Sequence, residues 1–382
     1  MSAPASVRHL YVHLPFCAHR CGYCDFVTVV GRRGQHAAYV DALLAELELE
    51  RELLAPAVET VFLGGGTPTF TEPRELERLL RALPQADEVT VEANPETVTP
   101  ELAALLRRCG VNRVSLGAQS FQPRLLRVLE RVAGPGDVRR AFYHLRDAGF
   151  DNISLDLIYG IPGQEPAELA ADMDEAVALA PEHLSCYELE AKPGTRFTHA
   201  HGDELQRQAE AMEDYFERVV ETLVGAGYRW YETSSFCRSA AAAGGRDLRA
   251  RHNLAYWRGR EYLGLGVGAF STVAAERWRT SPRLPLYLAA LRNRCVPPRE
   301  LERLPEEVVR EERVLLGLRL DEPMPLAPIA RGLDAAALAR LERLGLARRL
   351  GGGADAGGDG EALTLTTRGR LLGGAVTAEL LA

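Results

Sequence analysis

Three cysteines, Cys17, Cys21 and Cys24, lie close together just behind an apolar, strand-like stretch, Leu10–Leu14. Thiolates are ligands of iron–sulfur clusters, and such clusters are usually held by four cysteines. No fourth cysteine lies nearby in the sequence, so a cubane cluster bound here would leave one iron open to another ligand. The triplet therefore predicts a cluster whose open iron takes part in chemistry.

The same cysteines could instead hold zinc, with His13, His19 or Asp25 as a fourth ligand. Structural zinc sites favour paired CxxC ligands in closed tetrahedral coordination. The spacing here is CxxxCxxC. A zinc-stapled binding protein without redox chemistry is the alternative that this interpretation leaves open.

The elements that must position the cysteines alternate between short apolar runs and amphipathic helical stretches from about residue 8 to 190. The expected strands are Leu10–Leu14, Thr60–Leu63, Glu88–Glu92, Arg113–Leu116, Ile153–Ile158 and Leu184–Tyr187. The expected helices are Ala37–Leu54, Pro73–Leu83, Pro100–Cys109, Gly136–Ala148 and Pro166–Leu179. Six such units in succession predict an α/β fold, a parallel sheet curled into a partial (β/α)6 barrel.

Polar and glycine-rich segments follow these strands where each one ends. Gly64–Pro68 follows the second strand, Glu92 ends the third, Gln119 follows the fourth and Asp156 lies in the fifth. Sites in such folds gather at the carboxyl ends of the strands. We therefore expect these residues to share one rim with the cysteines.

The rest of the chain is expected to form a helix at Asp203–Ala226, a strand near Arg229–Ser235 and a glycine-punctuated strand at Tyr262–Phe270. Helices at Glu306–Leu318 and Ala335–Leu344 precede a hairpin, Leu346–Leu350 and Leu363–Thr366, around a low-complexity tip at Gly351–Gly360. This order is typical of a winged helix, for which a structural or lid role is expected because the local basic charge is weak. The predicted regions are a barrel core at 1–235, a connecting region at 236–300 and a C-terminal domain at 301–382.

The composition is that of a globular protein, with 46% hydrophobic and 26% charged residues among 382. A net charge of −8 gives no general signal for nucleic acid binding. Seven scattered or clustered cysteines do not form a secreted disulfide pattern, which favours a reducing cytoplasm. No signal peptide and no membrane-spanning apolar run are visible.

The CxxxCxxC spacing after a first strand resembles the radical S-adenosylmethionine (SAM) superfamily, and Gly64–Pro68 resembles its glycine-rich segment. The resemblance implies a [4Fe–4S] cluster on the three cysteines. It also implies that the amino and carboxylate groups of SAM chelate the fourth iron, and that one electron from the cluster cleaves SAM to a deoxyadenosyl radical.

Five segments, Tyr11–Cys17, Gly64–Thr69, Ser115–Phe121, Asp156–Pro162 and Gly264–Phe270, together resemble the coproporphyrinogen III oxidase-like branch of that superfamily. This branch holds anaerobic oxidases and haem chaperones, and the resemblance covers essentially the whole chain. The SAM-contacting positions that it implies are Tyr11, Gly65, Gly66, Thr67, Glu92, Gln119, Arg131, Asp156 and Phe270. Tyr23 is expected to lay its ring beside the adenine.

This chain departs from the oxidase pattern in two ways, and both favour the chaperone. The oxidase pattern has a further cysteine where this chain has Phe26, and it has a longer N-terminal arm. In addition, His252–Trp257 resembles the HNxxYW haem-binding motif of the chaperones, which implies haem contacts from His252, Asn253, Tyr256 and Trp257. Imidazole is a good axial ligand of haem iron, and aromatic rings offer flat apolar surface.

The sequence thus predicts a haem chaperone that depends on a [4Fe–4S] cluster and SAM and delivers haem to acceptors such as respiratory enzymes. Nearby arginines, Arg249, Arg251 and Arg258, are either partners of haem propionates or solvated charges. A homodimer is implied by resemblance. The alternative is an oxygen-independent coproporphyrinogen III oxidase, in which the radical abstracts a propionate hydrogen before decarboxylation.

Overall fold

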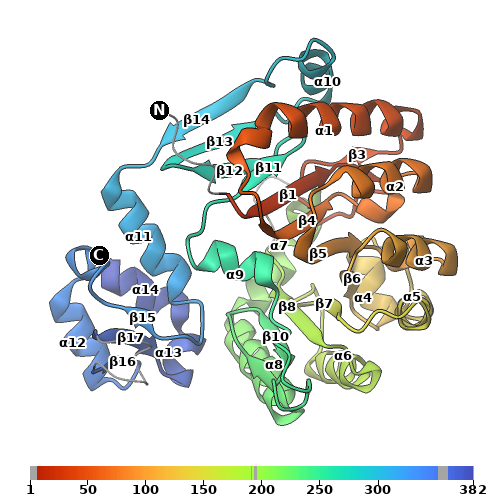
Figure 1. Ribbon diagram of the computed structural model, residues 1–382. Helices are drawn as coiled ribbons and strands as arrows, with labels where there is room; N and C mark the ends of the chain where they lie inside the picture. The colour runs from red at the N-terminus through yellow and green to blue at the C-terminus, as the bar shows by residue number, and fades with distance from the viewer. Residues whose placement is uncertain (1–6, 191, 193–195, 352–359, 382) are drawn as a thin grey trace.

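Six parallel strands form the centre of the sheet in the computed structural model, which describes residues 7–190, 192, 196–351 and 360–381. They are β1 (His9–Leu14), β4 (Val58–Gly65), β5 (Ala86–Ala93), β6 (Arg113–Gln119), β7 (Ile153–Tyr159) and β8 (His183–Glu188). They lie side by side in chain order, as expected for repeated β-α units (Figure 1). β11 (Leu263–Leu265) extends the sheet parallel to β1, and β10 (Ser235–Arg238) and β9 (Tyr228–Trp230) extend it antiparallel beyond β8. The prediction of an open α/β barrel is confirmed.

Helices cover the outer face of this sheet (Figure 1). They are α1 (His36–Glu50), α2 (Pro73–Ala82), α3 (Pro100–Arg108), α4 (Pro123–Val128), α5 (Pro135–Asp147), α6 (Pro166–Leu179) and α8 (Met212–Gly225). Five of them, α2 to α6, begin with proline. The fixed φ of proline and its missing N–H suit the first helical position, so these residues set where each crossover helix starts.

The two faces of the sheet differ in chemistry because successive side chains of a strand point to opposite sides. On β1, Leu10, Val12 and Leu14 join the main hydrophobic core under the helices. Of the alternate residues, which belong to the other face, His9 and His13 are buried too. That face carries buried polar side chains on every neighbouring strand, namely Thr60, Glu88, Arg113, Ser154 and His183. The interior of the barrel is therefore polar, and such groups are stable there only with hydrogen-bond partners.

Three predicted elements after the barrel were wrong in their bounds. The expected helix Asp203–Ala226 is two helices, α7 (Arg196–Gln208) and α8, separated by a 3-10 turn. The expected strand near Arg229–Ser235 is a hairpin, β9 and β10, that turns between Tyr231 and Ser234. The strand expected over Tyr262–Phe270 ends at Leu265, because Gly266 and Gly268 adopt left-handed backbone with φ of 107° and 73°.

Beyond this break the chain forms a separate three-stranded sheet, β12 (Phe270–Val273), β13 (Glu276–Thr280) and β14 (Arg299–Arg303), with α10 (Leu284–Arg292) inserted. The short helix α9 (Arg251–Trp257) lies between the barrel and the C-terminal elements (Figure 1). A two-stranded ladder, β2 (Phe16–Cys17) and β3 (Val29–Val30), brackets the cysteine loop.

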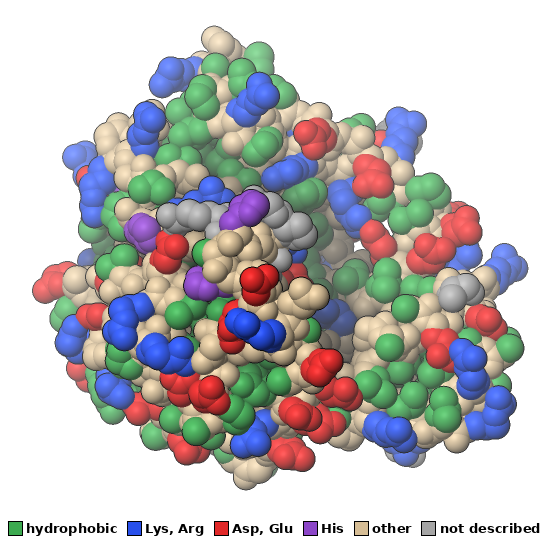
Figure 2. Space-filling model, turned by 180° about the vertical axis from the view of Figure 1, so that it is seen from behind, with side chains coloured by type: hydrophobic (Ala, Val, Ile, Leu, Met, Phe, Trp, Pro, Cys, Tyr) green, Lys and Arg blue, Asp and Glu red, His purple; other side chains and the backbone are tan. Residues whose placement is uncertain are grey.

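The C-terminal lobe, defined here as the elements from α11 to α14, folds around its own hydrophobic cluster. It contains α11 (Glu306–Gly317), β15 (Met324–Pro325), α12 (Ala335–Arg343), β16 (Ala347–Leu350), β17 (Ala362–Leu365), α13 (Thr367–Leu371) and α14 (Gly373–Leu381). The expected glycine-rich tip lies mostly outside the described residues. A recess of about 650 Å³ lies between this lobe and the barrel. Figure 2 shows the hollow between the two. None of the helices in the described part of the chain is long and apolar enough to cross a membrane.

Candidate functional site

The cysteine loop is held at the rim where the parallel strands end. Backbone bonds from Val29 N to Pro15 O and from Gly31 N to Cys17 O, both 2.8 Å, fasten the two sides of the loop. Cys17 is buried, and Cys21 and Cys24 are half-buried. All three line one cavity of about 380 Å³, the rim cavity, with residues from the ends of the neighbouring strands. The rim predicted from the sequence exists.

A chain of hydrogen bonds connects two of the three thiols. Thr67 Oγ1 donates to Cys17 Sγ over 3.4 Å, and Asn94 Nδ2 donates to Thr67 Oγ1 over 3.0 Å. Arg131 then donates to Asn94 Oδ1 over 3.0 Å and to Cys21 Sγ over 3.6 Å. Donors to cysteine sulfur favour the thiolate form that binds iron and tune a bound cluster. Burial raises the pKa of Cys17, and the bond from Thr67 opposes that rise.

Two buried carboxyl groups lie deeper in the rim cavity. Glu92 Oε2 accepts a bond of 3.1 Å from Gly65 N, and both oxygens of Asp156 accept from Ser115 Oγ at 3.0 and 2.9 Å. Burial, together with the nearby charge of Asp156, raises the pKa of Glu92 to about 7. Burial also raises the pKa of Asp156. Carboxyl groups of this kind gain from a ligand that brings an ammonium or hydroxyl donor.

The glycine segment packs tightly against β1. Gly65 has a φ of +110°, and a Cβ there would lie 2.4 Å from the His13 ring. A Cβ on Gly66 would lie 2.5 Å from Pro15 O. Close approach of two strands therefore requires glycine at both positions, apart from any contact with a ligand.

Most of the other residues that were expected to contact SAM also face this region. Tyr23, Thr67, Gln119 and Arg131 line the rim cavity. Tyr11 lines an adjoining inner cavity of about 210 Å³, which shares Gly65, Glu92 and Asp156 with the rim cavity. Phe270 lines neither of these two cavities. It is 46% exposed in β12, with the Arg279 guanidinium 5.3 Å above its ring. A SAM contact from Phe270 stays a prediction.

Helix α9 closes the opposite end of the barrel, where the strands begin. The Glu88 carboxylate accepts from the backbone N–H groups of Arg251 and His252 at 3.1 and 3.2 Å, which caps the start of the helix. The His252 ring is 1% exposed and stacks on Phe62, with centroids 5.2 Å apart. Its Nδ1 bonds Thr60 Oγ1 at 2.7 Å and its Nε2 bonds Tyr256 OH at 2.8 Å. Both ring nitrogens are thus occupied, and burial lowers the pKa of His252 to about 3.

The four residues of the predicted haem motif do not converge on one space. His252 and Tyr256 border the inner cavity, whereas Trp257 lines the recess against the C-terminal lobe. Asn253 borders both. The Arg319 guanidinium lies 4.2 Å above the Trp257 ring. The motif therefore forms a helix between the inner cavity and the recess.

The geometry gives no support to a zinc site. His13, one of the expected zinc ligands, uses Nδ1 for Tyr11 OH at 3.0 Å and Nε2 for Val27 O at 2.9 Å. Within the described ranges, no group of three or more histidine, cysteine, aspartate or glutamate side chains is arranged to bind a single metal ion.

Sequence reasoning missed Asn94 and Ser115, which link the rim residues to one another. Asn94 lies two residues after Glu92 at the end of β5, so strand alternation is a signal for it. Thr60, the partner of His252, carries no such signal because it lies 192 residues away in an ordinary strand.

The comparisons with known proteins agree with this geometry. The model of the radical SAM superfamily matches residues 11–176. The haem chaperone HemW of Mycobacterium tuberculosis is 38% identical over 97% of this chain and 94% of its own length. HemW of Bacillus subtilis is 32% identical over 82% of this chain and 83% of its own. The structure of coproporphyrinogen III oxidase HemN from Escherichia coli superposes with a TM-score of 0.80 at 22% identity, covering 100% of this chain and 91% of that one.

A partial β/α barrel with three cysteines and a glycine segment at its rim defines a radical SAM protein, a class whose cofactors are a [4Fe–4S] cluster and SAM. Within that class, the chain belongs to the HemW family.

Proposed function

We propose that this protein is a haem chaperone, which binds haem and delivers it to haem-requiring proteins in dependence on a [4Fe–4S] cluster and SAM. The observation that carries the proposal is its likeness to HemW along 97% of the chain, joined to a rim cavity whose three thiols suit a cluster with an open iron. When bound, the cluster and SAM supply one-electron chemistry at that iron.

The chain's own residues have separate tasks at the rim. Cys17, Cys21 and Cys24 would hold the cluster, and Thr67 and Arg131 would keep two of the sulfurs oriented by the bonds described above. Glu92 and Asp156 would receive the polar groups of SAM, and Tyr23 its adenine. Cys17 is buried, so the wall of the rim cavity beside it would keep water from the iron.

Haem is taken up at the end of the barrel that α9 closes, where His252, Asn253, Tyr256 and Trp257 lie. The place of the exposed Phe26 supports a chaperone rather than an oxidase. Phe26 is 61% exposed and lines both the rim and the inner cavity, where the oxidase pattern carries a further cysteine. We also propose that the protein lies in the cytoplasm, that its acceptors include respiratory enzymes and that it forms a homodimer.

Four measurements on anaerobically purified protein test this proposal. Iron and sulfide analysis should give one [4Fe–4S] cluster per chain, whereas zinc in its place would contradict the cofactor assignment. Titration with haem should give a saturable complex, and mixing that complex with an apo haem protein should transfer the haem. Rapid decarboxylation of coproporphyrinogen III without a stable haem complex would establish the oxidase instead.

A further inference from the structure

A continuous chain of buried hydrogen bonds leads from the rim cavity to the start of α9. It begins at Asp156, which lines the rim cavity, and passes through Ser154 and His183 to Tyr231. The Tyr231 hydroxyl then accepts from the backbone N–H of Ala250, the residue that precedes α9. Ser154, His183 and Tyr231 are fully buried, so these groups depend on one another for hydrogen-bond partners.

The register of the sheet brings these side chains together. Ser154 in β7 is the direct neighbour of His183 in β8, and Asp156 lies two residues further along β7, on the same face. Ser154 Oγ donates to Asp156 Oδ1 over 3.3 Å and lies 2.9 Å from His183 Nδ1. Tyr231 follows β9, and its hydroxyl lies 2.8 Å from His183 Nε2 and 3.2 Å from Ala250 N. Segments far apart in the sequence thus form one chain of hydrogen bonds.

The bonds of this chain share one direction, toward Asp156. The backbone N–H of Ala250 can only donate, and the Asp156 carboxylate can only accept. Ser154 has one hydroxyl proton, and because it donates that proton to Asp156 it accepts from Nδ1 of His183. Burial lowers the pKa of His183 well below 6.5, so the ring is neutral and its Nε2 accepts from the Tyr231 hydroxyl. Hydrogen bonds that run in one direction polarise and strengthen one another.

The chain acts on a buried carboxyl group at the rim. Burial raises the pKa of Asp156, and its hydroxyl donors Ser115 and Ser154 oppose that rise, as does the charge of Arg113. The N–H of His183 occupies an acceptor site of Ser154 Oγ, which keeps the Ser154 proton turned toward Asp156. A carboxylate held in its ionised form is the stronger partner for a hydroxyl or ammonium group of a ligand.

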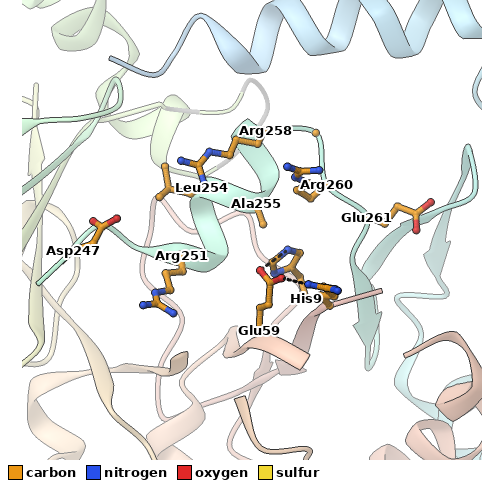
Figure 3. A pocket seen from close by; sticks show the side chains of 11 residues that line it. His9, Glu59, Asp247, Arg251, Leu254, Ala255, Arg258, Arg260 and Glu261 are labelled. Carbon is orange, nitrogen blue, oxygen red and sulfur yellow. Dashed lines mark hydrogen bonds and ion pairs between the residues drawn. The ribbon is translucent and has the colours of Figure 1, made fainter. Parts of the chain in front are cut away.

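Tyr231 connects this chain to two other parts of the molecule. Its hydroxyl holds the backbone of Ala250 before α9, and its carbonyl oxygen accepts from Asp321 N at 3.0 Å, in the C-terminal lobe just beyond α11. Helix α9 also borders a cavity of about 680 Å³ with a mostly charged lining, which Figure 3 shows with Arg251 and Arg258 at the two ends of the helix. A shift of α9 or of the lobe would therefore displace Tyr231 and the donor that it offers to His183.

We propose that His183 and Tyr231 are positioning residues for SAM, which act through Ser154 on Asp156, and that they couple occupation of the SAM site to the position of α9. This inference rests on the proposed function for the placing of SAM at Asp156. Coupling between two sites is reciprocal: if the observed position of α9 strengthens SAM binding, bound SAM stabilises that position. The presence of SAM is thereby communicated to the helix at the opposite end of the barrel.

The test uses the full-length protein with its cluster, titrated with SAM in a calorimeter without a reductant, so that SAM stays intact. His183→Leu removes the donor to Ser154 and should weaken SAM binding about 3–10-fold, the usual effect of one lost hydrogen bond. His183→Asn has nearly the same size as His183→Leu, but its amide can donate to Ser154, so it should restore most of the affinity. A merely structural role of His183 would give both variants the same affinity.

Tyr231→Phe removes only the hydroxyl and should weaken SAM binding by a similar factor. Its matched control is Tyr228→Phe, which loses a buried bond of 2.8 Å to Pro181 O outside the chain and should bind SAM as the wild type does. Hydrogen–deuterium exchange measures the coupling to α9. Bound SAM should slow exchange at residues 250–257 in the wild type but not in Tyr231→Phe.

The outcomes separate the two proposals. If His183→Leu and Tyr231→Phe bind SAM as the wild type does, or if His183→Asn is as weak as His183→Leu, the chain does not position Asp156, and the proposed function stands without it. Exchange at α9 that SAM leaves unchanged in the wild type would overturn the coupling. If the wild type with a full cluster binds no SAM, the proposed function itself is wrong.

Circular dichroism and thermal unfolding report whether each variant folds. Ser154→Ala removes one hydroxyl from the same chain and carries the same expected loss of SAM affinity, so it replaces His183→Leu if the leucine variant does not fold.

Discussion

The two ends of the barrel use buried polar side chains in different ways. At the rim, the polar groups of the strand ends face a cavity, and several of them, including Glu92 and Arg131, line it directly. At the α9 end, Glu88, Thr60 and His252 use their hydrogen bonds on one another and on the helix that closes the barrel. The rim is therefore built to receive a ligand, whereas the α9 end is built to hold a helix. Both ring nitrogens of His252 serve the fold, and a haem contact from this residue stays a prediction.

The largest effect should follow from removing one of the three rim cysteines. Replacing Cys17, Cys21 or Cys24 by alanine should abolish binding of the [4Fe–4S] cluster, because two thiolates cannot hold a cubane with an open iron. Iron and sulfide content and visible absorption measure this loss. The exposed Cys295, far from the rim in the chain, supplies the control, and Cys295→Ala should keep the cluster. Full iron content in the rim variants would contradict the site.

At the α9 end, His252→Ala should lower the free energy of unfolding by about 2–4 kcal/mol, because it opens a cavity and leaves Thr60 and Tyr256 without a buried partner. The pKa of His252 in the folded protein, about 3, lies below the ordinary 6.5. The stability that the neutral ring contributes is therefore present above about pH 6.5 and is lost as the pH falls toward 3.

Chemical denaturation at several pH values, with the wild type and His252→Ala side by side, measures both effects. His9→Ala should cost less than His252→Ala, since His9 has a single hydrogen bond of this kind. Equal costs for the two variants would show that the second hydrogen bond of His252 adds no stability.

The rim was predictable and the α9 end was not, for a physical reason. Cys17, Glu92, Gln119 and Asp156 could be assigned together because parallel strands bring their carboxyl ends to one edge. The sequence motif located His252, but not its burial, because Thr60 and Glu88 reach it only through the register of β1, β4 and β5. The hydrogen bond between His9 and Thr60 was missed too, since nothing in a short apolar strand marks one histidine as different. The breaks at Gly266 and Gly268 depend on a left-handed backbone conformation. Glycine can adopt it, but the presence of a glycine in the sequence does not show that it does.

Glu46 is a buried carboxyl group that lies at neither end of the barrel, and it therefore serves as a third case in the comparison. Like Glu92 it has a pKa raised to about 7 by burial, but it accepts bonds from Gly266 N and Tyr287 OH, both 2.7 Å, and lines none of the cavities described above. A raised pKa alone thus does not mark the site.

Because the folded protein holds the proton of Glu46 more tightly than the unfolded chain, its contribution is full below about pH 4.5 and declines as the pH rises to about 7. Glu46→Gln removes this titration, so the wild type should lose up to about 3 kcal/mol relative to the variant across that window. Urea denaturation of both proteins at intervals between these pH values measures the difference. If the difference in free energy of unfolding between the two proteins does not change with pH, Glu46 is ionised throughout this window.

The smallest effect is expected at Arg251, the first residue of α9. Arg251 is half exposed and lies 3.4 Å from Asp87, so Arg251→Gln should change the free energy of unfolding by less than about 1 kcal/mol. If its guanidinium meets a haem propionate, the same variant should weaken haem binding a few fold, and added salt should reduce the gap because exposed charges are screened. Arg139→Gln, at an exposed pair with Glu175 on the helical face, changes a similar charge and should leave haem affinity unaltered. Equal affinity of wild type and Arg251→Gln at low salt would show that the propionates lie elsewhere.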